Sequence, residues 1–175
     1  MAWPTTDQIG DRTTSRQLSL LSAVLQLRLN EDIREKQGLA YSPNAGSSTS
    51  DVFPGYGYMV VAAETAPESL PKLFTAVDAI AADLRDNPIG EDELNRARRP
   101  ALERLRRSMA DNGYWLTQLS EAQSDPASLD QTRRHIAVQD GGAIPKPVQR
   151  RILARQAGGE RIAFQPRQRN PGMTC

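Results

Sequence analysis

Apolar residues recur at intervals of three and four positions through the first part of the chain. They are Leu18, Leu20, Leu21, Val24, Leu25, Leu27 and Leu29. This spacing predicts an amphipathic helix over residues 13–37, because positions three and four apart lie on the same helical face. We expect the helix to be buried up to Leu29 and more polar beyond a break near Asn30. Gly38 predicts its C-terminal end.

The pattern changes to the two-residue period of strands between residues 41 and 65. Residues 41–50 are small and polar and include Pro43, which is typical of an edge strand or a strongly bent strand. A turn is expected at Gly55. Residues 56–65 then carry apolar side chains at both odd and even positions, which predicts an interior strand with at least one face under helices. The two segments should form a β-hairpin.

Helical periodicity returns after the hairpin. Pro67 fits the first turn of a helix whose apolar face would consist of Leu70, Leu73, Phe74, Val77, Ile80, Ala81 and Leu84. A highly charged helix follows, beginning at the acids of residues 91–93, and Pro100 is expected to kink it or to end its first part. A short helix around Tyr114 completes the series, with Trp115 as a core residue.

The order of helix, two strands and several helices predicts an α+β fold class. Its two layers would be helices packed on a mainly antiparallel sheet. A sheet of two strands is rarely stable by itself. The domain is therefore expected to be incomplete, with further strands supplied by missing sequence or by a partner.

A change of composition near residue 130 divides the chain. Residues 131–175 hold nine lysines and arginines against two acids, and breaker-rich stretches such as "DGGAIPKP" and "RQRNPGMTC" interrupt them. We therefore expect a partial domain over residues 1–135 and a basic, Gly/Pro-containing tail over residues 136–175. A degenerate closing helix and a short strand over residues 161–166 are expected in the tail.

Composition and single residues exclude several classes of function. The chain is 38% apolar and 25% charged with a net charge of +1, which is typical of a globular protein and indicates no particular partner. No apolar run approaches the roughly 20 residues that span a bilayer, so no membrane partner is expected. Cys175 is the one cysteine and His135 the one histidine. Zinc motifs of the HExxH or HxxEH kind need two histidines, so we predict no metal-binding residues. A nucleophile triad would have to use His135, which lies between arginines and Ile136 on an expected solvated helix face, so we predict no catalytic residue.

Arginines are dense between Arg96 and Arg107, a pattern that also occurs on nucleic-acid-binding surfaces. Acids at residues 91–93 and at Glu103 accompany them, which favours a salt-bridged, solvated helix face. The basic tail has Phe164 as its one aromatic residue and no nucleic-acid motif. No nucleic-acid partner is therefore predicted.

Arg34 and Tyr41 lie seven residues apart on the two sides of the turn expected at Gly38. Arg34 would occupy the last helical turn and Tyr41 the first strand position, so both side chains can reach one end of the sheet. A guanidinium and a phenol are directional donors, and together they can hold a peptide carbonyl or stabilise an oxyanion. The residues alone are equally consistent with Arg34 paired to a nearby acid and Tyr41 packed against the fold.

The segment "LQLRLNEDIREKQGLAYS" closely resembles the start of the non-catalytic, C-terminal half-domain of pitrilysin/insulinase-type zinc metallopeptidases. These inverzincins include mitochondrial processing peptidase. Their non-catalytic domain carries an arginine and a tyrosine seven residues apart, which match Arg34 and Tyr41. The resemblance covers about residues 14–135, and residues 111–130 are similar to the bacterial zinc-protease branch in particular.

The resemblance implies a zinc-free part of a metalloendopeptidase that is inactive by itself. Arg34 and Tyr41 would bind an extended peptide substrate, while an HxxEH-bearing partner domain or subunit would hold the zinc and hydrolyse the peptide. The chain itself would bind no cofactor, and a dimer is one further expected arrangement. The bacterial branch makes the periplasm a candidate compartment, although the N-terminus has no signal peptide pattern.

Two departures from the family pattern and one alternative function stay open. The strands that precede the first helix in a complete family domain are expected to be missing, and the chain after about residue 140 matches the family poorly. The alternative function is a non-proteolytic structural subunit of the same fold. The intact pair of Arg34 and Tyr41 favours the peptidase, because a structural subunit needs neither side chain.

Overall fold

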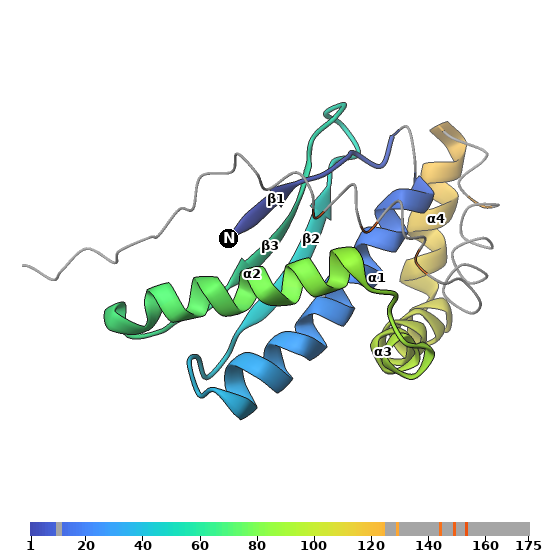
Figure 1. Ribbon diagram of the computed structural model, residues 1–175. Coiled ribbons are helices and arrows are strands. Elements are labelled where there is room, and N and C mark those ends of the chain that lie inside the picture. Colours follow the sequence, from blue (N-terminus) through green and yellow to red (C-terminus); the bar gives the residue numbers. More distant parts are fainter. Residues whose placement is uncertain (10–11, 125–128, 130–143, 145–148, 150–152, 154–175) are drawn as a thin grey trace, which may run out of the picture.

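The computed structural model describes residues 1–9, 12–124, 129, 144, 149 and 153 (Figure 1). Within them, four α-helices pack with a three-stranded antiparallel sheet whose strand order is β1-β3-β2. The predicted α+β fold with helices layered on an antiparallel sheet is confirmed. None of the helices in the described part is long and apolar enough to cross a bilayer.

The first helix, α1, spans Arg12–Leu29 and continues as a π-helical segment, η1, over Asn30–Lys36. Leucines 18, 21, 25 and 29 of the predicted apolar face are fully buried, because this face lies in the core. The expected break near residue 30 is the change from α-helical to π-helical winding. Gly38 follows with a φ of +60°, and the predicted end of the helix at this residue is confirmed.

The hairpin consists of β2, Asn44–Thr49, and β3, Gly57–Ala62. The two strands are antiparallel, with the first residue of β2 opposite the last of β3. As predicted, β3 lies inside the sheet and β2 lies at an edge. Tyr41 precedes β2 instead of beginning it, so that expectation was wrong. Strand pairing starts only at Asn44 because the chain first turns across the end of η1, burying Ala40 and Pro43.

A third strand, β1, spans Ala2–Pro4 and pairs with β3. The expectation that no strand precedes α1 was therefore wrong, as was the expectation of a two-stranded sheet. Three residues are too few to show a strand period in the sequence, and proline, here Pro4, is uncommon inside strands. Proline is tolerated at an edge where its nitrogen points away from the partner strand, and the N–H of the next residue, Thr5, donates to the Gly57 carbonyl at 2.8 Å.

Three further helices follow the hairpin. A 3-10 turn, η2, over Pro67–Ser69 leads into α2, Leu70–Asp86, which confirms the start predicted at Pro67. The next helix, α3, runs over Glu91–Met109 with Pro100 inside it. Pro100 therefore does not end the helix, because it lies on an exposed face where water can solvate the carbonyl that loses its partner.

The last described helix, α4, spans Asn112–Ser124. Trp115 lies on it with 38% of its surface exposed, so the prediction of a core residue was wrong. Its indole N–H instead donates to the Met109 carbonyl at 2.7 Å, where α3 ends, and its ring contacts Tyr114 edge-on. The Trp115 side chain thus donates a hydrogen bond to a backbone carbonyl at the C-terminal end of α3, where carbonyls lack partners within the helix, and does not fill the core.

The hydrophobic core lies between the sheet and the helices and includes Met59, Val61 and Trp3 from one face of the sheet. Ile144 and Leu153 are also buried in this core. His135, Cys175, the strand expected over residues 161–166 and the boundary expected after residue 135 lie outside the described residues.

Candidate functional site

Arg34 is carried by the π-helical segment η1, which is anchored by Ile33. The Ile33 side chain is fully buried, while Arg34 beside it is exposed. The segment closes with two backbone hydrogen bonds, from Gln37 N–H to the Asp32 carbonyl at 3.1 Å and from Leu39 N–H to the Ile33 carbonyl at 2.9 Å. Such wide helical turns occur frequently at functional sites.

Tyr41 lies in the loop between η1 and β2, and this loop is held from both sides. The Thr65 hydroxyl donates to the Leu39 carbonyl at 2.5 Å on one side of Tyr41. On the other side, the Gln26 amide donates to the Pro43 carbonyl at 2.8 Å. Tyr41 itself is 80% exposed, so a fixed backbone presents a phenol to solvent.

The structure brings Arg34 and Tyr41 together. The guanidinium carbon of Arg34 lies 5.2 Å from the centroid of the Tyr41 ring, which is the geometry of a cation–π contact. Within the described residues, Arg34 has no ion pair with an acid, and Tyr41 is not packed into the fold. The two residues therefore form one exposed pair, with guanidinium N–H groups and a phenolic O–H available to an acceptor such as a peptide carbonyl.

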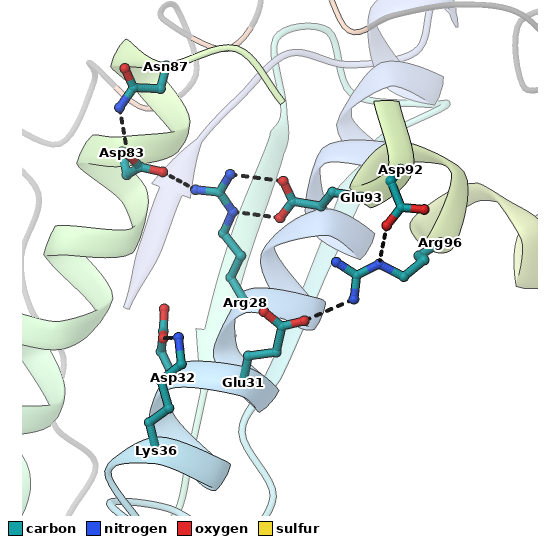
Figure 2. Close-up of polar contacts among 9 residues, drawn as sticks. All are labelled: Arg28, Glu31, Asp32, Lys36, Asp83, Asn87, Asp92, Glu93 and Arg96. Carbon is teal, nitrogen blue, oxygen red and sulfur yellow. Dashed lines mark hydrogen bonds and ion pairs between the residues drawn. The ribbon is translucent and has the colours of Figure 1, made fainter. Parts of the chain in front are cut away.

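Ion pairs link the helix that leads to this pair with α2 and α3 (Figure 2). On α1, Arg28 donates to both carboxylate oxygens of Glu93 at 2.7 and 3.0 Å and to Asp83. The hydrogen bond to Glu93 raises the pKa of Arg28, and the hydrogen bond from Asn87 lowers the pKa of Asp83. Sequence reasoning missed this cluster, because its members come from three helices.

Three other charged residues of η1 form ion pairs. Lys36 contacts Asp32 at 2.6 Å, and Glu31 contacts Arg96 of α3 at 3.0 Å (Figure 2). These contacts leave the guanidinium of Arg34 free to lie over Tyr41. Arg96 also contacts an acid one turn earlier on α3, which agrees with the salt-bridged face predicted for that helix.

The donor set of the chain does not suit a zinc ion. The described residues contain no group of three or more histidines, cysteines, aspartates or glutamates placed to hold a metal. The whole sequence has one histidine and one cysteine, which cannot build a protein zinc site of the usual kind. Arg34 and Tyr41 offer hydrogen-bond donors and a positive charge, and neither residue is a usual zinc ligand.

Comparisons with known proteins identify the family. Residues 1–100 match the family described as the Peptidase M16 inactive domain. The chain is 32% identical over 107 residues to the chloroplastic stromal processing peptidase of rice. This alignment covers 61% of the present chain and 8% of the rice protein. It thus spans a small part of the curated relatives that it matches.

Solved structures show the same fold. The peptidase M16 inactive domain from Pseudomonas fluorescens superposes with a TM-score of 0.69 and 21% identity, covering 88% of this chain and 36% of that chain. The inactive peptidase domain of a Bordetella parapertussis protein described as a "putative zinc protease" gives a TM-score of 0.65 and 19% identity. The match covers 97% of this chain and 92% of that chain.

The match to the family extends over more than half of the chain and includes Arg34, Tyr41 and the elements that carry them. Inactive domains of this family pair with a catalytic half. The pitrilysin/insulinase-type resemblance is thereby confirmed: the chain belongs to the peptidase M16 family of zinc-dependent proteases, as an inactive domain.

Proposed function

We propose that this chain is the substrate-binding, zinc-free part of an M16 metalloendopeptidase. Arg34 and Tyr41 would bind the backbone of an extended peptide, and a separate zinc-bearing domain or subunit would hydrolyse it. The observation that carries this proposal is the exposed contact between the two side chains. A cation and a phenol held together at the surface offer convergent donors to a peptide carbonyl.

The physical reason for two donors is the charge that develops during peptide hydrolysis. The carbonyl oxygen becomes an oxyanion, and donors that are already oriented stabilise it without reorganisation. A zinc ion in the partner half would supply the activated water. Among the described residues, the side-chain contact of Arg34 and Tyr41 is with each other at the surface, so binding a carbonyl would break no buried interaction there.

The experiment measures hydrolysis of a quenched fluorescent peptide library by the zinc-bearing half, with and without this chain. We expect activity to depend on the chain. Arg34→Ala and Tyr41→Phe should each lower kcat/KM by about 100-fold, the usual effect of removing one oxyanion donor. Because both side chains are exposed and share only a surface cation–π contact, neither variant should change the free energy of unfolding by more than about 1 kcal/mol.

Arg85→Ala is the matched control, since Arg85 is an exposed arginine on α2 that pairs with the adjacent Asp86. It should leave hydrolysis unchanged. If the two halves associate but hydrolysis never depends on this chain, the proposal fails and the chain is a structural subunit of the same fold.

A further inference from the structure

Gln26 on α1 connects the two segments that carry Arg34 and Tyr41. Its Nε2 donates to Asn30 Oδ1 at 3.1 Å and to the Pro43 carbonyl at 2.8 Å. Its Oε1 accepts a hydrogen bond from Ala45 N–H at 2.7 Å. All the hydrogen-bonding groups of this half-buried amide except one lone pair are therefore used.

The contacts with Pro43 and Ala45 imitate a neighbouring strand. In an antiparallel sheet, alternate residues of an edge strand direct their carbonyl and N–H groups away from the sheet. Val61 of β3 lies opposite Ala45, and it exchanges both of its backbone hydrogen bonds with Met1 on its other side. The N–H of Ala45, and by alternation the carbonyl of Pro43, therefore face outward from β2. The Gln26 amide has the same donor and acceptor as a peptide group, and it binds both outward groups where a strand would bind them.

The hydrogen bond from Gln26 to Asn30 also connects Gln26 with η1, the segment that carries Arg34. Asn30 is the first residue of η1, the segment that carries Arg34, and Pro43 lies two residues after Tyr41. The Gln26 side chain thus links the start of η1 with the end of the loop that carries Tyr41. We propose that Gln26 is a positioning residue that keeps Arg34 and Tyr41 in contact.

The first test uses the chain alone, so it does not depend on the proposed function. The Tyr41 ring should shift the Arg34 Nε–H proton resonance upfield, and Tyr41→Leu sets the value without the ring. A carboxylate cannot donate, so Gln26→Glu loses the hydrogen bond to the Pro43 carbonyl and places two acceptors against each other there, whereas the Asn30 amide can turn and donate instead. We expect the Arg34 resonance in Gln26→Glu to move to its position in Tyr41→Leu.

Gln17→Glu is the matched control, because Gln17 lies on the same helix and is also half-buried. It should leave the Arg34 resonance unchanged. Asn30→Ala removes one of the three hydrogen bonds and leaves those to Pro43 and Ala45, so it tests the link if Gln26→Glu does not fold. An unchanged Arg34 resonance in Asn30→Ala and in a folded Gln26→Glu chain would overturn the proposal.

The second test asks whether the positioning matters for peptides, and this part rests on the proposed function. In the hydrolysis assay, Gln26→Glu should lower kcat/KM by about two- to fivefold, the worth of an exposed cation–π contact. If Arg34→Ala and Tyr41→Phe leave hydrolysis unaffected, the proposed function fails. The resonance shift would still decide whether Gln26 positions the pair.

Discussion

At the scale of single residues, Gly38 determines where η1, the helical segment that carries Arg34, ends. Its φ of +60° lies in the left-handed region, where a side chain collides with its own backbone. A Cβ placed at Gly38 would meet no other atom within 4 Å. Glycine is therefore required here by backbone conformation and not by lack of space.

We predict that Gly38→Ala lowers the free energy of unfolding by about 1 kcal/mol, because alanine is strained at this φ. Urea denaturation followed by circular dichroism measures the change. Gly46→Ala on β2 is the matched control, since its Cβ also meets nothing within 4 Å and its φ is not left-handed. It should be neutral or slightly stabilising. Equal losses in the two variants would contradict the explanation from backbone conformation.

The same scale explains why the proposed site contributes little to stability. Arg34 and Tyr41 lie on the surface, and an exposed cation–π contact contributes only about 0.5–1 kcal/mol. The residues that hold them, such as Ile33, Ala40 and Pro43, are buried. The proposed function and the stability of this short segment would thus depend on different side chains.

At the scale of elements, Arg28 joins three helices. It lies on the last turn of α1 and contacts Asp83 of α2 and Glu93 of α3, with only 17% of its side chain exposed (Figure 2). The two hydrogen bonds to Glu93 are parallel, which is the strongest arrangement for an arginine and a carboxylate. Because η1 continues directly from this turn, Arg28 also restrains the segment that carries Arg34.

We predict that Arg28→Met lowers the free energy of unfolding by about 2–4 kcal/mol, since it leaves Glu93 half-buried without its cation. Chemical denaturation measures the loss, and Arg28→Met combined with Glu93→Gln should recover part of it. Arg96→Met is the control, because Arg96 forms its ion pairs on the surface with half of its side chain exposed. Such pairs contribute about 0–1 kcal/mol, so a comparable loss at Arg96 would show that burial is not the cause.

At the scale of the whole molecule, β1 adds a third strand to the described sheet and contributes to the core. Its central residue, Trp3, has no exposed surface and lies opposite Met59 of β3. Met1, which directly precedes β1, exchanges a pair of hydrogen bonds with Val61 of β3, both at 2.9 Å. The first residues of the chain are therefore part of the fold and not a disposable extension.

We predict that Trp3→Ala lowers the free energy of unfolding by about 3–5 kcal/mol, as removal of a large core side chain does. Thermal or urea unfolding measures the loss. Trp115→Ala is the matched control, because Trp115 is 38% exposed and should cost about 1 kcal/mol, the worth of its hydrogen bond. Trp3→Phe should cost less than Trp3→Ala, since the indole N–H has no partner among the described residues. A small loss in Trp3→Ala would mean that β1 is dispensable.

Much of the fold could be predicted from local patterns. The leucine spacing of α1, the interior position of β3 and the start of α2 near Pro67 all follow from periods and breakers within a few residues. Arg34 and Tyr41 were selected by their resemblance to a family motif. Gln26, Arg28 and Thr65 could not be selected in this way, because their partners lie 17 to 65 residues away in the sequence.

The sequence by itself determined the α+β fold class, the amphipathic faces and the turn at Gly38, because periodicity and glycine conformation are local properties of the chain. The family resemblance also rests on the order of residues alone. Only the tertiary structure decided that three N-terminal residues form an edge strand, that Trp115 is exposed, and that Arg34 lies over Tyr41. The strand depends on pairing with the distant β3, which no local pattern shows. The exposure of Trp115 and the contact of Arg34 with Tyr41 depend on side-chain orientations that residue spacing leaves open.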